Sequence, residues 1–377
     1  MERKLLIFLF LFLIFFPIGR IVYQRWNYYL SSFRPEEVEK AYGISQYVLE
    51  KAPSWISDEI HFAYASWRYL KGGSPILINP DYPPLGKYII AFSIKFWHNE
   101  KIPILLFSLT TPFSIYLISQ LFIESKTWAL VPVILFSWEK LFQEQLIYIP
   151  LFELFSLTFL NLSFYFFLKA EVKNSYFWLS SLFLGALWAT KPWMLTIPLV
   201  ISWFIYLIFK RDFRKLLNWL ISLLAAFLVV ILSYFRLLIE GWNIYKILSA
   251  QKWIMWYHRS KLIKPASVWP FIYLRRWYVW WGEKPFLPVE QWNILWPTFT
   301  TLALVFSALV FLKTYRRTKK GLRWLKFDKR VIAICLWFFG DLIFLSLGNI
   351  NVRYLFYLLP FAYILGIYFL FNSFLAK

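Results

Sequence analysis

The chain has 377 residues, of which 60% are hydrophobic and only 16% charged, and its formal net charge is +21. A soluble globular domain is about half apolar and about a quarter charged, so this composition excludes that class. Long apolar runs, in place of short alternating strands, exclude a transmembrane β-barrel. The single cysteine allows no internal disulfide and indicates no cysteine-based metal cluster. The sequence predicts an all-α, polytopic membrane protein.

The first predicted element is a helix over residues 5–23, preceded by basic residues. That order is typical of a signal peptide, but this apolar run is too long and no small-residue cleavage site follows it. We therefore expect an uncleaved transmembrane helix with a cytoplasmic N-terminus. Nine further apolar runs predict a single domain, residues 1–377, with about ten spans. These runs lie at 103–122, 127–142, 150–168, 176–190, 193–209, 216–238, 294–312, 331–348 and 354–374.

One segment, residues 83–101, is ambiguous, because its apolar core is short for a span and contains Lys95. Charge decides its placement, since cytoplasmic loops carry an excess of Lys and Arg. If the segment lies along the outer surface, the basic stretches 210–215 and 313–330 both face the cytoplasm. If it crosses the membrane, both face outward. We therefore expect an amphipathic interfacial helix at 83–101.

This threading predicts an integral, multi-pass protein of the cell membrane with both termini in the cytoplasm. It leaves two long outer loops, 24–102 and 239–293, and we expect no soluble C-terminal domain. The second loop is strongly basic, which favours an anionic partner on the outer face. Long loops are exempt from the orientation rule, so this charge does not contradict the threading.

The first outer loop contains adjacent acids, Asp58 and Glu59, in the stretch SDEIHFAYASWRYLKGG. One interpretation is structural: Asp58 or the serine before it caps a helix that runs to about Leu70 and ends at Gly72-Gly73. The other is functional, because a carboxylate close to the membrane surface can act as a general base.

Three more ionisable residues fall on the predicted outer face, namely Glu153, Lys191 and Arg353. Each has a structural interpretation by itself, since an acid suits the first turn of a helix and a basic side chain at a helix end extends toward water. Together with Asp58, however, they place two acids and two bases on one face beside a basic, aromatic loop. That combination fits a site that handles a phosphate and a hydroxyl group.

Asp341 differs from these residues because it lies near the middle of the predicted helix at 331–348. An ionisable group at that depth is costly and is a functional hypothesis by default. A hydrogen bond between helices explains it equally well. It is therefore not included in the predicted site.

The stretch DEIHFAYASWRYLKGG, followed by PPLGKY, resembles the first outer loop of the protein O-mannosyltransferases. This family belongs to the C-type superfamily of membrane glycosyltransferases, which use lipid-phosphate sugars. Tyr82 stands where the family has a histidine before Pro-Pro. The matching residues are Asp58, Glu59, His61, Phe62, Tyr69, Gly72, Pro83, Pro84, Leu85, Gly86 and Lys87.

Weaker matches follow in the family's order, so the resemblance covers nearly the whole chain, although only the first loop is specific. Glu153 falls where the family usually has an aspartate. The other matches are Lys191, Tyr257, His258, Ser267, Trp269, Pro270, Arg353, Tyr354 and Pro360.

The resemblance implies transfer of a hexose, mannose in the family, from a polyprenyl-phosphate donor to a protein Ser or Thr on the outer face, with inversion. Asp58 is the expected general base, with Glu59 beside it in the catalytic pair. Cations stabilise the leaving phosphate. The expected cations are Lys87, Lys191 and Arg353, helped by Arg275 or Arg276. The other expected substrate-binding residues are His61, Tyr82, Glu153 and His258.

No nucleotide-binding loop occurs, and no nucleic-acid partner is expected. The chemistry requires no metal or other cofactor, although Asp58, Glu59 and Glu153 could bind a divalent ion.

Because of Tyr82, a lipid or cell-envelope glycan remains an alternative acceptor. A lipid-linked sugar transporter or flippase is a second alternative, which broken helices at mid-bilayer would favour. A non-catalytic scaffold is a third.

Overall fold

The computed structural model describes residues 2–259, 265–278, 286–316, 327–348 and 350–372. In this part of the chain helices dominate, and a single pair of short antiparallel strands forms the sheet. The predicted all-α class is confirmed. Part of the basic stretch 313–330 lies outside the described residues.

Five described helices are long and apolar enough to cross a membrane. They lie in α1 (Glu2–Gln24), α6 (Ile102–Ser119), α12 (Phe213–Ser233), α16 (Leu295–Arg316) and α18 (Leu355–Leu370), the last preceded by the 3-10 turn η3 (Val352–Tyr354). The other bundle helices are shorter: α7 (Val131–Ser137), α9 (Glu153–Lys169), α10 (Tyr176–Trp188), α11 (Ile197–Phe209) and α17 (Val331–Ser346). Helices thus occur in all ten predicted runs, while ten complete spans remain a prediction.

One predicted run, 127–142, is not a continuous helix. It holds the 3-10 turn η1 (Trp128–Leu130), then α7, and then α8 (Lys140–Glu144). The chain breaks at Glu139, whose backbone is extended. Its buried carboxylate accepts hydrogen bonds from the Asn293 amide, the Trp296 indole and the Tyr363 hydroxyl. A buried carboxylate is stable only with such donors, and they join α8 to α16 and α18.

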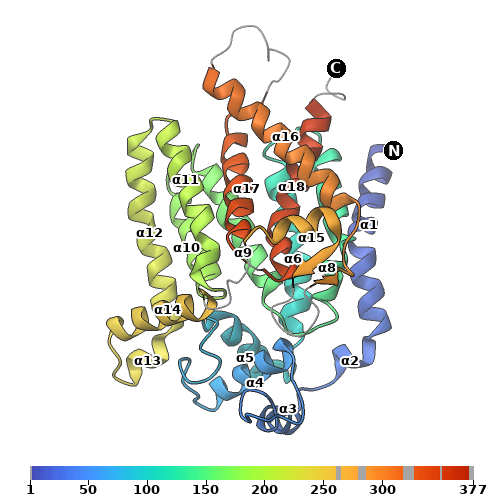
Figure 1. The fold of residues 1–377 in the computed structure, drawn as a ribbon. Helices are drawn as coiled ribbons and strands as arrows, with labels where there is room; N and C mark the ends of the chain where they lie inside the picture. The colour runs from blue at the N-terminus through green and yellow to red at the C-terminus, as the bar shows by residue number, and fades with distance from the viewer. Residues whose placement is uncertain (1, 260–264, 279–285, 317–326, 349, 373–377) are drawn as a thin grey trace.

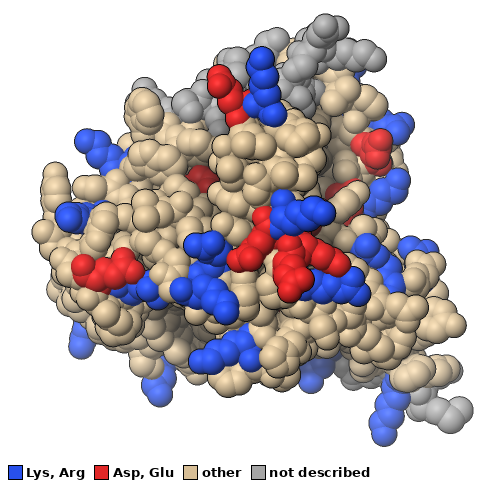
Figure 2. Space-filling view, turned by 90° about the horizontal axis from the view of Figure 1, so that it is seen from below, with Lys and Arg blue, Asp and Glu red and all other residues tan. Residues whose placement is uncertain are grey.

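The two long predicted loops contain short helices that gather at one end of the bundle. The N and C ends of the chain are marked at the opposite end (Figure 1). The first loop holds α2 (Trp26–Leu30), α3 (Pro35–Gly43), α4 (Asp58–Leu70) and α5 (Leu85–Trp97). The second holds α13 (Phe235–Ile239), α14 (Ile244–Arg259), α15 (Val268–Leu274), β1 (Arg276–Tyr278) and β2 (Phe286–Pro288). Figure 2 views the end with α2–α5 and shows acidic side chains gathered in a patch with Lys and Arg around it.

The helix predicted from the acidic pair is confirmed, because α4 begins at Asp58 and ends at Leu70. Ser57 occupies the N-cap position but makes no side-chain capping hydrogen bond. Gly72 follows the helix with φ +92°, a conformation that suits glycine. The capping interpretation of Ser57 therefore lacks its hydrogen bond, and Asp58 has another partner, described below.

The segment predicted as an interfacial helix contains α5, which is amphipathic. Ile90, Ala91 and Ile94 are buried, whereas Phe92 and Phe96 are more than half exposed. An exposed aromatic edge of this kind suits the headgroup region of a membrane. The start of α5 packs tightly on the bundle, because a Cβ atom at Gly86 would lie only 2.9 Å from the Phe152 ring.

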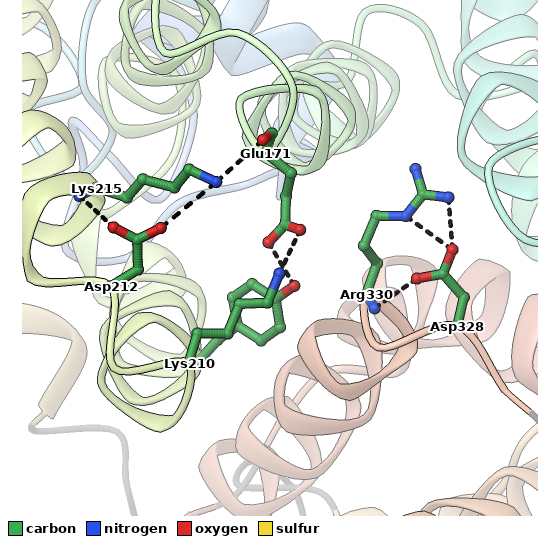
Figure 3. Close-up of polar contacts among 7 residues, drawn as sticks. Glu171, Lys210, Asp212, Lys215, Asp328 and Arg330 are labelled. Carbon is green, nitrogen blue, oxygen red and sulfur yellow. Dashed lines mark hydrogen bonds and ion pairs between the residues drawn. The ribbon is translucent and has the colours of Figure 1, made fainter.

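A network of ion pairs lies at the end opposite α2–α5, where α9, α11, α12 and α17 meet (Figures 1 and 3). The Lys210 ammonium and the Tyr206 hydroxyl donate to the Glu171 carboxylate, and Lys215 donates to the Glu171 carbonyl. Beside them Arg330 pairs with Asp328 at 2.6 Å. These contacts tie helix ends together and engage part of the basic residues at this end.

Candidate functional site

A cavity of about 370 Å³ opens where the segment that holds α2–α5 meets the bundle. The start of α4, the segment at 81–82, the start of α9 and the end of α14 contribute to it. Five tyrosines line it, together with the charged or titratable residues Asp58, Asp81, Glu153, Lys191, His258 and Arg353. Another part of the wall is apolar and consists of Met194, Leu195, Phe344, Leu345 and Leu347. The cavity therefore joins a charged region to a lipid-like surface.

Four of the predicted site residues form a continuous chain of opposite charges inside this cavity. The Arg353 guanidinium donates to the Asp58 carboxylate at 2.6 Å, and the Lys191 ammonium donates to Glu153 at 2.7 Å. Arg353 also lies 4.0 Å from Glu153 and so links the two pairs. The residues come from distant parts of the sequence, as expected for a site built between elements.

Local structure fixes each of these side chains at the end of an element. Asp58 and Glu153 are the first residues of α4 and α9. The Lys191 amide bonds to the Leu187 carbonyl just beyond α10. Arg353 lies in η3, where the Asn351 side chain accepts a hydrogen bond from its backbone amide at 3.0 Å. Helix starts and turns hold them more rigidly than a free loop would.

The environment keeps Asp58 ionised. Burial raises the pKa of its carboxyl, but the charges of Arg353 and Lys191 and the hydrogen bond from Arg353 outweigh burial, so the net pKa lies below its ordinary value. The Asp58 side chain lines the cavity and is 32% exposed, so a molecule in the cavity could contact it. Asp58 can therefore receive a proton, although Arg353 holds it in the charged form.

Lys87 is not placed as predicted, since it lies beneath the cavity and does not line it. Its ammonium is fully buried and donates to the Asn79 carbonyl at 2.6 Å, to the Asn79 side chain at 3.0 Å and to the Tyr82 carbonyl at 2.8 Å. Burial lowers the pKa of Lys87 to about 7, and Asp81 raises it in part. The expected direct contact with phosphate stays a prediction that this placement does not favour, because all three N–H donors are directed to segment 79–82.

His61 also lies behind the wall. Its Nδ1 accepts from the Asn79 amide at 3.4 Å, and its ring lies 3.9 Å from that of Tyr47. Burial and the charge of Lys87 lower the pKa of His61 to about 4, against the attraction of Asp58. His61 is therefore neutral at neutral pH and supports the wall without reaching substrate.

Tyr82 and His258 line the cavity as predicted. The Lys191 ammonium lies 4.9 Å from the centre of the Tyr82 ring, within the range of a cation–π contact. The His258 Nε2 donates to the Asp81 carbonyl at 3.1 Å. Tyr82 therefore places an aromatic ring against the buried lysine.

Three predicted residues are not brought to the cavity. Glu59 follows Asp58 on α4 but does not line the cavity. Arg275 has φ +56° at the end of α15, and its Nε donates to the Val289 carbonyl. Arg276 is exposed on β1. The catalytic role of Glu59 and the substrate contacts of Arg275 and Arg276 stay predictions without support from this placement, since a motif that fixes sequence order does not fix side-chain direction.

Sequence reasoning missed Asp81 and Tyr47, which line the cavity, and named Tyr257, which also lines it, only as a match to the family pattern. Asp81 directly precedes the matched Tyr82-Pro-Pro segment, and this position was the available signal. Tyr47 lies in an irregular stretch that carries no periodic pattern. Within the described ranges, no group of three or more His, Cys, Asp and Glu side chains is arranged to hold a metal ion.

Neither a protein-family model nor a curated protein matches this sequence. The fold and the cavity therefore define the class: a helical bundle with membrane-spanning potential that carries a charged, aromatic cavity with an apolar wall at one end.

Proposed function

We propose that the protein is a membrane glycosyltransferase that moves a hexose from a polyprenyl-phosphate donor to a hydroxyl group. The chain of charges Asp58–Arg353–Glu153–Lys191 inside a partly apolar cavity carries this proposal. It supplies a carboxylate for a hydroxyl proton next to two cations for a phosphate. The resemblance of the first outer loop to protein O-mannosyltransferases points to the same chemistry and favours mannose as the sugar.

The two kinds of wall suit the two parts of such a donor. Met194, Leu195, Phe344, Leu345 and Leu347 offer an apolar surface for the polyprenyl chain. Lys191 and Arg353 lie at its charged end. Arginine offers a planar fork to phosphate oxygens and lysine a compact charge, so together they can hold a phosphodiester.

In the proposed reaction Asp58 accepts the proton of the acceptor hydroxyl while its oxygen forms a bond to the anomeric carbon. The bond from that carbon to the phosphate oxygen breaks, and its electron pair leaves with the polyprenyl phosphate. The attack and departure occur on opposite faces, so the sugar is inverted. Lys191 and Arg353 stabilise the charge that develops on the phosphate, which is usually the largest catalytic contribution.

Donor binding also activates the base in this mechanism. Without substrate, Arg353 is engaged by Asp58 and lies near Glu153. A bound phosphate competes for the same guanidinium, so it weakens the Arg353–Asp58 pair. Loss of that partner raises the pKa of Asp58 toward the ordinary range and makes its carboxylate a better proton acceptor.

The proposed acceptor is a Ser or Thr hydroxyl of a protein on the outer face, and a lipid or envelope glycan is the alternative that Tyr82 keeps open. N and C ends on the side opposite α2–α5 support a cavity facing away from the cytoplasm if both ends are cytoplasmic (Figure 1).

The test is a transfer assay with the purified protein in nanodiscs. Polyprenyl-phosphate mannose is supplied with either a Ser/Thr peptide or an oligosaccharide, and mass spectrometry follows one added hexose. Gain of mass on either acceptor supports the proposal and identifies the acceptor class. No gain on both, with donor recovered intact, contradicts it.

A further inference from the structure

Asp81 is a carboxylate of the cavity that the proposed mechanism does not use. It lines the same space as Asp58 and Glu153. Those two acids bind Arg353 and Lys191, the cations assigned to phosphate. The Asp81 Oδ1 instead accepts from the neutral Asn79 amide at 2.7 Å.

Buried groups fix the backbone of Asp81 on both sides. Lys87 donates to carbonyls at both ends of segment 79–82. His258 donates to the Asp81 carbonyl itself and connects α14 to it. Asn79 has φ +51°, a left-handed conformation that asparagine tolerates. The side chain therefore extends from a held backbone, as a recognition group must.

Aromatic rings border the same part of the cavity. Tyr47 and Tyr257 both line it. Burial raises the pKa of the Tyr47 phenol, and the charges of Asp58 and then Asp81 raise it further, so this ring lies within electrostatic reach of both acids. A carboxylate accepts hydrogen bonds from sugar hydroxyls, and aromatic rings pack on the apolar faces of a sugar.

We propose that Asp81 recognises the hydroxyl groups of the donor hexose and thereby selects the sugar, with Tyr47 and Tyr257 bordering the ring. This inference rests on the proposed glycosyl transfer. It assigns the sugar to Asp81 and the phosphate to Lys191 and Arg353. A site built to bind a substrate hydroxyl discriminates strongly against donors that lack it.

The experiment compares polyprenyl-phosphate mannose with its 2-, 3-, 4- and 6-deoxy analogues, using the full-length protein in nanodiscs. In the parent, removal of at least one hydroxyl should lower kcat/KM about tenfold to a hundredfold, as expected for a hydrogen bond to a charged group. Asp81→Asn keeps the size and one acceptor oxygen. Its kcat/KM for the complete donor should fall by a similar factor. Removing the same hydroxyl from the donor should then hardly lower kcat/KM further.

Two further measurements separate sugar recognition from structural damage. Polyprenyl phosphate without a sugar should inhibit Asp81→Asn and the parent equally. Glu240→Gln, which changes an exposed acid paired with Arg236 on α13, should retain the parent's pattern. Asp81→Glu, which keeps the charge, should recover part of the hydroxyl preference.

The outcomes distinguish the two proposals. A parent that transfers no hexose from any of these donors overturns the proposed function and this inference together. A parent that transfers hexose but uses all deoxy donors equally overturns only the inference. The inference also fails if Asp81→Asn keeps the parent's full sensitivity to the deletion, or if that sensitivity follows hydroxyls of the acceptor instead.

Discussion

Arg353 and Asp58 are 295 positions apart in the sequence, yet the guanidinium of one donates to the carboxylate of the other at 2.6 Å. The contact joins the start of α18, through η3, to the start of α4. It holds the proposed base in its ionised form and at the same time occupies a cation that the donor phosphate needs.

Replacing Asp58 by asparagine should leave the protein folded and lower hexose transfer at least about a hundredfold, because general base catalysis contributes about 10²–10⁴-fold. Steady-state transfer kinetics give the rate, and monodisperse elution in detergent reports the fold. Transfer within tenfold of the parent would remove Asp58 from the chemistry and leave it a partner of Arg353 only.

Replacing Arg353 by glutamine should move the acid limb of the pH–rate profile to higher pH. Protonated Asp58 is inactive, and the net effect of burial and its cationic neighbours, Arg353 foremost, is to lower its pKa. In the parent, kcat/KM should therefore hold down to below the ordinary carboxyl pKa of about 4. Without the guanidinium the pKa rises, so activity should be lost at a higher pH. If the acid limb stayed at the same pH, even with a lower maximal rate, Arg353 would not set the pKa of Asp58.

Lys191 and Glu153 form a buried pair, with side chains 7% and 3% exposed. Lys191→Met should cost about 3–5 kcal/mol of stability, because it leaves Glu153 with its nearest cation removed. It should also weaken donor use about tenfold to a hundredfold. The double variant Lys191→Met/Glu153→Gln is the matched control, since it should recover stability but not donor use.

Thermal unfolding and donor kinetics of the single and double variants separate these effects. Lys191→Arg should restore donor use only in part, because the fork differs in shape from the ammonium. If the double variant regained both stability and donor use, Lys191 would serve the fold alone.

His61 should make the protein less stable in mild acid. Burial and Lys87 lower its pKa in the folded protein to about 4, whereas the unfolded chain binds the proton near 6.5. The His61 contribution is thus complete above about pH 6.5 and is lost as pH falls toward 4, at up to about 1.4 kcal/mol per pH unit. His61→Gln should flatten this part of the curve of unfolding free energy against pH. Parallel curves for the two proteins would contradict the assignment.

The placement of α5 can be tested with single cysteines in a Cys335→Ala background. His98 and Arg214 are both exposed in the structure. His98→Cys should react with an impermeant thiol reagent on intact cells, and Arg214→Cys only after permeabilisation. Labelling of both from the same side would mean that α5 crosses the membrane and that the predicted threading is wrong.

The sequence was sufficient for the helical class, for α4 and for the four charges of the cavity. Charges are rare in this chain, and the positive-inside rule placed those four on one face, where the structure brings them together. The sequence was not sufficient to predict which way a side chain points or how deeply it is buried. Lys87 was expected at the phosphate, but its helix turns it into the interior toward Asn79 and Tyr82.

The remaining misses have similar physical causes. Asp81 lies in irregular backbone, where no periodicity predicts which way a side chain points. The break at Glu139 depends on donors more than 150 residues away, at Asn293 and Trp296. Arg275 is directed to the Val289 carbonyl by a left-handed turn that its sequence does not signal.

Single-step transfer from a polyprenyl-phosphate hexose in the cavity around Asp58 and Arg353 inverts the anomeric carbon, so the configuration of the product is decisive. It is measured by proton NMR after transfer from a donor of defined anomer. We expect one product of the opposite configuration, absent with Asp58→Asn. A product that retains the donor's configuration, or equal product from Asp58→Asn, would contradict it.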